Sequence, residues 1–161
     1  MKKSVKKGIV ILLGIALSGI CVYILWYISN TPNYYEYPIN DTMDAGTILN
    51  ECRIPEATLE TMTDEELAQA VADFPLLIDV LTAYSIEYGV ECLANESDAY
   101  KELLSRENGK QAMIAKVVEL QEREDTEEIK IQVEILKKII LNEPLFKTDL
   151  TESEKEILLA E

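Results

Sequence analysis

Residues 126–142 read TEEIKIQVEILKKIILN, and this stretch decides the fold class. Its apolar side chains recur at the three- and four-residue spacing of one helical face: Ile129, Val133, Leu136 and Ile140. Three further isoleucines widen that face well past about 100°: Ile131, Ile135 and Ile139. We therefore expect a long central helix that begins after the N-cap Thr126 and ends near Asn142, ahead of Pro144.

Capping boxes mark two more helices. The Thr63 hydroxyl can accept an amide of the first turn while Glu66 reaches back to the cap, which predicts a helix from Asp64. Thr151 and Glu154 repeat this pattern and predict the last helix. The sequence contains no run of alternating apolar and polar residues that would indicate a strand.

Shorter helices are expected between these. Prolines and capping serines mark their starts: Pro55, Pro75, Ser85 and Ser97. Gly89 weakens the helix after Ser85 by about 1 kcal/mol relative to Ala, and Gly109 after Asn108 predicts a left-handed helix stop. The fold class is therefore all-α: residues 46–161 are expected to form an acidic, irregular bundle of about six to seven short helices.

The N-terminal part of the chain predicts a single transmembrane helix. Residues 8–28 carry no charge, and these 21 positions span about 31 Å as a helix, close to the thickness of a bilayer core. Lysines precede the apolar run and aromatic residues end it, as membrane-interface residues do: Lys2, Lys3, Lys6, Lys7, Trp26 and Tyr27. The expected location is the cell membrane, with residues 1–7 cytoplasmic, residues 8–28 in contact with lipid and the C-terminal domain extracytoplasmic.

Two alternatives to an anchor have weaker support. Ala16-Leu17-Ser18 offers small residues for signal-peptide cleavage, but cleavage there would leave an exposed apolar N-terminus. Cys21 suggests a lipoprotein, yet Ile20 occupies the position where a small residue is expected. On the anchor itself, the four-residue spacing of Gly14 and Ser18 is typical of a helix–helix contact in membranes.

Residues 29–45 are rich in turn formers and predict a juxtamembrane linker. Three tyrosines interrupt this stretch: Tyr34, Tyr35 and Tyr37. Phenol rings so placed either lie among lipid headgroups or pack on the flank of the domain, and the sequence leaves both open.

Charge and composition exclude several functions. From residue 30 onward the chain has eleven basic and thirty acidic residues, a net charge of −19, which repels nucleic acid. The chain has no histidine, which removes Ser-His and Cys-His nucleophile pairs and imidazole zinc sites. It has no glycine-rich phosphate loop either, so we expect no cofactor, no metal site and no enzymatic activity.

Two acids and two thiols remain as candidates for chemistry. Asp73 and Asp79 lie in apolar surroundings, where a carboxyl group can serve as the acid of a hydrolase. Cys52 and Cys92 both fall in the extracytoplasmic part, where oxidation is permitted. They form either a disulfide or two free thiols, and their spacing favours neither.

Two blocks of this domain carry a resemblance to known proteins. The first is Cys52-Arg53-Ile54-Pro55, Leu59, Met62-Thr63-Asp64-Glu65-Glu66-Leu67, Asp73-Phe74-Pro75-Leu76-Leu77 and Asp79. The second is Leu103-Leu104-Ser105-Arg106-Glu107 and Gly109. Within residues 52–113 they resemble exported or membrane-anchored helical proteins from gut-dwelling Firmicutes. The resemblance implies a bacterial, exported helical module and assigns no activity.

The sequence thus predicts a membrane-anchored module that binds a protein partner, or has a structural role, at the cell envelope. One alternative is an envelope hydrolase that uses paired carboxylates, which would place two acids in a concave pocket with one of them buried. Another is an accessory or sensor subunit of a membrane complex that assembles through Gly14 and Ser18.

Overall fold

The computed structural model describes residues 34–83, 85–123 and 126–160, which belong to one compact unit that begins at Tyr34. The predicted anchor, residues 8–28, lies outside the described residues. The same is true of its interface and contact residues: Lys2, Lys3, Lys6, Lys7, Trp26, Tyr27, Gly14 and Ser18. Within the described residues, every helix is too short or too polar to cross a bilayer.

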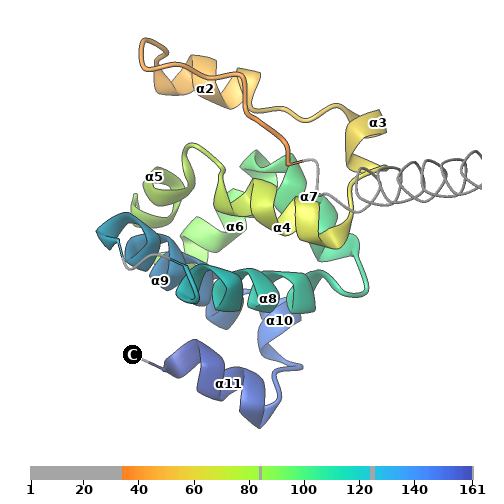
Figure 1. Ribbon diagram of the computed structural model, residues 1–161. Helices are drawn as coiled ribbons and strands as arrows, with labels where there is room; N and C mark the ends of the chain where they lie inside the picture. The colour runs from red at the N-terminus through yellow and green to blue at the C-terminus, as the bar shows by residue number, and fades with distance from the viewer. Residues whose placement is uncertain (1–33, 84, 124–125, 161) are drawn as a thin grey trace, which may run out of the picture. The chain divides into compact units, whose positions relative to one another are not determined.

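The described residues contain ten helices and no strand, which confirms the all-α prediction (Figure 1). The helices are α2 (Ala45–Glu51), α3 (Glu56–Leu59), α4 (Asp64–Ala72), α5 (Leu77–Thr82), α6 (Ile86–Glu96), α7 (Asp98–Ser105), α8 (Gly109–Gln121), α9 (Glu127–Asn142), α10 (Pro144–Lys147) and α11 (Glu152–Leu159). Their number exceeds the predicted six or seven, and two of them, α2 with a cap at Asp44 and the one-turn α10, were not anticipated at all.

The predicted capping boxes are present. Thr63 accepts a hydrogen bond from the amide of Glu66, whose carboxylate accepts one from the Thr63 amide in return, and α4 begins at Asp64. Thr151 and Glu154 make the same exchange at the start of α11. These bonds satisfy amides that the first turn of a helix leaves without partners, so local sequence alone fixes both starts.

The core lies where α4, α7, α8 and α9 meet. α4 packs against α7 and α8, α8 packs against α9, and α6 connects α5 to α7 and α9. Completely buried side chains come from each of the four central helices, among them Leu67, Leu103, Val117 and Leu136. The prediction that α9 is central is correct for one side of the helix only, because Ile131 is 51% exposed.

Two glycines serve close packing and do not end helices. Gly109 is the first residue of α8, and it does not have the left-handed backbone conformation, so the predicted stop is wrong. A Cβ at Gly109 would lie 2.1 Å from the carbonyl oxygen of Leu103, so any side chain there would collide with the backbone of α7. A Cβ at Gly89 would lie 2.8 Å from the Cα of Leu81, so Gly89 lets α6 approach the backbone of α5.

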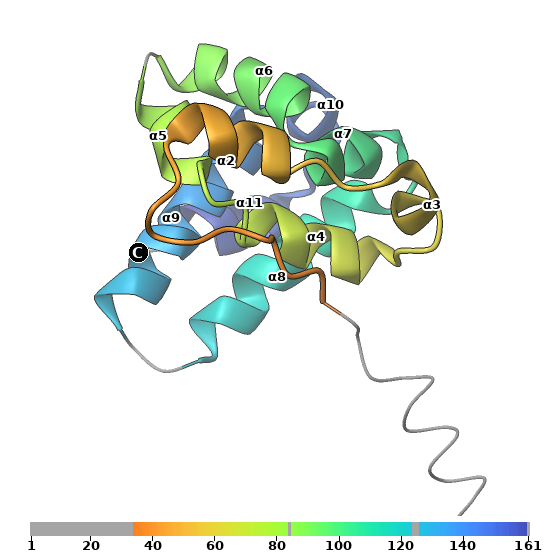
Figure 2. The ribbon, with the colours of Figure 1, turned by 90° about the horizontal axis from the view of Figure 1, so that it is seen from above.

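Residues 34–43, which we call the strap, pack on the domain (Figure 2). The Tyr37 hydroxyl donates a hydrogen bond of 2.9 Å to the carbonyl of Ala70 in α4. The Tyr37 ring meets Phe74 edge-on at 6.0 Å, and Tyr35 meets Tyr37 edge-on at 5.1 Å. The sequence left two placements open for these tyrosines, among lipid headgroups or on the flank of the domain. Tyr35 and Tyr37 pack on the domain. The compact unit therefore begins within the predicted linker 29–45.

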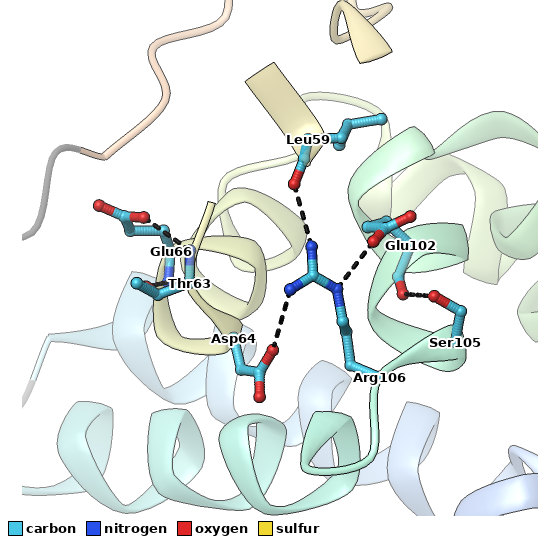
Figure 3. A network of polar contacts seen from close by, with 7 residues as sticks. All are labelled: Leu59, Thr63, Asp64, Glu66, Glu102, Ser105 and Arg106. Carbon is cyan, nitrogen blue, oxygen red and sulfur yellow. Dashed lines mark hydrogen bonds and ion pairs between the residues drawn. The ribbon is translucent and has the colours of Figure 1, made fainter. Parts of the chain in front are cut away.

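An arginine connects the first helices of the domain to α7 (Figure 3). Arg106 donates to the carboxylate of Glu102 at 2.7 Å and to the carbonyl of Leu59 at 3.1 Å, and it lies 3.7 Å from the carboxylate of Asp64. One guanidinium group thus joins the end of α3, the start of α4 and the end of α7. Its planar set of donors suits this role better than a lysine would.

Candidate functional site

A groove lies between α5 and α9, and we call it the α5–α9 groove. Its wider part has a volume of about 530 Å³. The residues that line this part are Ala72, Asp73, Phe74, Pro75, Leu77, Ile78, Glu128, Ile131, Gln132 and Ile135. Seven of these ten side chains are apolar and three are polar, which is a composition typical of binding clefts.

A second hollow of about 330 Å³ continues the groove along the same two helices. Its lining residues are Leu81, Thr82, Ile86, Ile135, Lys138 and Asn142. Ile135 lines both hollows, so they are neighbours along α9. Between Glu128 and Asn142 the groove follows α9 for about 21 Å, at 1.5 Å per residue.

Two large apolar side chains of the groove are open to solvent. Ile78 of α5 is 52% exposed and Ile131 of α9 is 51% exposed. Both line the same hollow, one from each wall. A single exposed isoleucine is ordinary on a protein surface, whereas two that converge on a concave apolar surface are typical of an interaction site.

The walls of the groove are fixed by contacts behind them. Gln132 donates a hydrogen bond of 2.8 Å to the carbonyl of Ala72, which ties α9 to the end of α4. Gly89 allows α6 to support α5 from behind. Phe74 is buried and is held by its edge-on contact with Tyr37 of the strap. These contacts hold the groove open without help from a ligand.

The charged groups of the groove are separated along its length. Asp73 and Glu128, both exposed, line the wider part near the start of α9. Lys138 lines the second hollow, near the end of α9. The two ends of the groove therefore carry opposite charge.

A buried polar network lies behind Asp73. The Lys116 side chain is almost fully buried, donates a hydrogen bond of 2.7 Å to the amide oxygen of Gln69, and pairs with Glu119. The Gln69 amide in turn donates a hydrogen bond of 2.6 Å to Asp73. The Tyr34 ring lies 5.5 Å from the Lys116 ammonium group, and burial and the nearby Glu119 raise the pKa of Tyr34. This network orients Asp73 toward the edge of the groove.

The candidate acids and thiols do not gather in one place. Asp73 lines the groove, whereas Asp79 does not, and both carboxylates are exposed. The second acid in the hollow is Glu128, which is also exposed. Cys52 and Cys92 are both free thiols in the structure, and burial raises the pKa of Cys52. Across the described part of the chain, no three acid or thiol side chains lie close enough to share a metal ion.

The groove itself was not anticipated from the sequence. The sequence places Ile131 in the apolar stripe of α9, and Ile78 only within the helix expected after Pro75, with nothing to mark either side chain as exposed. The width of the apolar stripe on α9 was the available signal, because a helix apolar over more than one face needs more neighbours than a small bundle supplies.

Comparisons of the chain with protein-family models, with curated proteins and with solved structures found no match.

Proposed function

We propose that this protein is a membrane-anchored, extracytoplasmic module that binds a protein partner through the α5–α9 groove. The observation that carries the proposal is the pair of exposed isoleucines, Ile78 and Ile131, on opposite walls of one groove. Because each side chain is already about half buried, its complete burial by a partner contributes about 1 kcal/mol. The groove is supported from behind, so a partner binds without first having to reshape it.

The anchor is supported by sequence. The uncharged length of residues 8–28, the lysines before them and the aromatic residues at their end all agree on one orientation. The strong negative charge of the remainder disfavours contact with nucleic acid and with anionic lipid, which leaves protein as the class of partner.

Photocrosslinking tests the groove. The full-length chain carries a benzophenone side chain either at Ile131, in the groove, or at Leu159, which is 67% exposed and lies outside it. We expect a discrete adduct from position 131 in intact cells and none from position 159. Equal adducts from both positions, or none from position 131, would contradict the proposal.

Protease accessibility tests the topology. Protease is added to cells that have been stripped of their wall but keep an intact cytoplasmic membrane. An epitope placed after Glu161 should be digested, and one placed before Lys2 should be protected. Recovery of the intact, uncleaved chain from the cytosolic fraction would refute the membrane part of the proposal and leave the groove to be judged by crosslinking.

A further inference from the structure

We infer that the occupant of the α5–α9 groove is an amphipathic α-helix of a partner protein, about four turns long, with basic side chains in its first turn and its axis parallel to α9. This inference rests on the proposed function and adds the shape, the charge and the direction of the bound segment. Each property follows from a separate feature of the groove.

The shape of the groove fits a helix. The groove extends along α9 for about 21 Å, the length of about 14 helical residues. Two apolar positions of α9 line the groove, the exposed Ile131 and the partly buried Ile135, and because they are four residues apart they lie one turn from each other. A helix with apolar residues at three- and four-residue spacing would place one side chain beside each of them and others against Ile78 on the facing wall.

The charges of the groove set the direction. Asp73 and Glu128 mark one end, and Lys138 marks the other. The N-terminus of a helix carries partial positive charge and its C-terminus partial negative charge, so the bound helix is best placed with its N-terminus at the acidic end. Lysine or arginine in its first turn would add to this preference. The acidic end of the groove lies at the start of α9, which makes the two helices parallel.

The net charge of the domain also indicates whether the bound helix comes from a second copy of this chain or from a different protein. A second copy of this chain would bring another strongly acidic domain, since residues from 30 onward carry a net charge of −19, and the two domains would repel each other. An anionic membrane surface is disfavoured for the same reason. A basic helix of a different protein meets complementary charge at the groove's acidic end.

Two synthetic peptides of 14 residues test the inference. Both consist of leucine and alanine with one apolar face and carry the same hydrocarbon staple on the opposite face, which keeps both helical although lysine in a first turn and glutamate in a last turn oppose the helix dipole; the forward peptide has two lysines in its first turn and two glutamates in its last, and the reversed peptide has these charges exchanged. Binding to the full-length chain in nonionic detergent is measured by fluorescence anisotropy, with empty micelles as the blank. We expect the forward peptide to bind about fivefold more tightly than the reversed one.

Three variants locate the site. Ile131→Glu should weaken both peptides by about thirtyfold, because it places a charge against an apolar face. Leu159→Glu, at a similarly exposed position outside the groove, should change neither. Glu128→Lys should abolish or invert the preference for the forward peptide, since it reverses the charge at the acidic end.

The outcomes separate this inference from the proposed function. Equal binding of both peptides, lost together in Ile131→Glu, would overturn the charge and direction and leave the groove as a binding site. Binding that Ile131→Glu does not affect would overturn both. If neither peptide binds, the helix is overturned as occupant, while crosslinking at position 131 still tests the function. A dimer of the chain that Ile131→Glu dissociates would show that a second copy is the occupant.

Discussion

Gly89 has no side chain, and this allows α6 to pack closely behind α5, which forms one wall of the groove. A Cβ at this position would lie 2.8 Å from the Cα of Leu81 and 3.0 Å from the carbonyl oxygen of Val80, and neither backbone atom can move without moving α5. Gly89→Ala should therefore lower the free energy of unfolding by about 1 to 3 kcal/mol, although alanine is the better helix former. Urea denaturation at neutral pH measures the change.

Gly46 provides the matched control. It lies in α2, and a Cβ there would meet only the flexible carboxylate of Asp44, at 3.2 Å. Gly46→Ala should therefore leave the stability unchanged or raise it by up to about 1 kcal/mol. If both substitutions stabilise the protein equally, the close approach of α6 to α5 is wrong.

Tyr100 carries a buried hydroxyl group that donates a hydrogen bond of 3.0 Å to Glu143. Tyr100→Phe leaves a buried carboxylate oxygen without this donor and should cost about 1 to 3 kcal/mol at pH 7. Burial also raises the pKa of Tyr100, with a further contribution from Glu143. The folded state thus keeps a proton that the unfolded state releases, so stability should fall as the pH rises past about 10.

Denaturation at pH 7 and at pH 10.5 checks both parts. The wild-type chain should lose more stability between these values than Tyr100→Phe does, because the variant lacks the titrating phenol. An equal loss in the two proteins would show that Tyr100 does not contribute to alkaline unfolding.

Individual residues were predictable from sequence where the signal is local. Thr63 and Thr151 were identified as caps because a capping box involves only four consecutive residues. Gly109 was misassigned because its role depends on Leu103, a neighbour across a turn that the local pattern does not reveal. Ile131 was misassigned because burial depends on which helices cover α9, and sequence periodicity does not specify them.

At the scale of an element, α11 should respond to acid. The backbone N–H of Thr151 donates a hydrogen bond to Glu154 and lowers the pKa of that carboxyl, and Lys110 adds to this effect. Stability from a lowered pKa is present above the unfolded value, about 4.3, and is lost as the pH falls through the folded value. The hydrogen-exchange rate of the α11 amides, relative to that of the α8 amides, should therefore be higher at pH 3 than at pH 6, because α8 has no side-chain cap and no acidic residue in its first turn.

Two substitutions in α11 separate the cap from general charge effects. Glu154→Gln keeps an acceptor for the Thr151 amide but removes the titration, so the response of α11 to acid should shrink. Glu156→Gln lies in the same helix outside the capping box and should leave the response intact. If the two variants behave alike, the cap is not the origin of the effect.

Elements differ in how far sequence predicted them. The starts of α4, α7, α9 and α11 follow their capping residues. α5 begins at Leu77, two residues after Pro75, and has no side-chain cap, so its start depends on packing. α2 was missed because it has no fully buried residue and therefore no apolar stripe that periodicity could detect.

At the scale of the whole molecule, the strap moves the N-terminal boundary of the domain. A fragment of residues 46–161 follows the boundary predicted from sequence and lacks the contacts of Tyr37 with Ala70 and Phe74. It should be less stable than a fragment of residues 34–161 by about 2 kcal/mol, the contribution of one buried aromatic side chain. Thermal unfolding followed by circular dichroism measures the difference.

Tyr37→Phe in the longer fragment isolates the hydrogen bond to Ala70. Its cost should be about 1 kcal/mol, smaller than that of removing the strap. Equal stability of the two fragments would mean that the strap does not contribute to the fold.

The all-α fold class was predictable from sequence because helix caps and apolar periodicity repeat along the chain, whereas the strap has neither.

The position of the strap also determines how the domain would yield to mechanical force. Tension applied at the N-terminal end would act first on Tyr35 and Tyr37, which would detach one after the other, before the chain of α4 itself was pulled. Phe74 would lose its ring contact at the same moment, and Phe74 forms part of the groove wall. Stretching the chain from that end would thus alter the wall of the α5–α9 groove while the helical core remained folded.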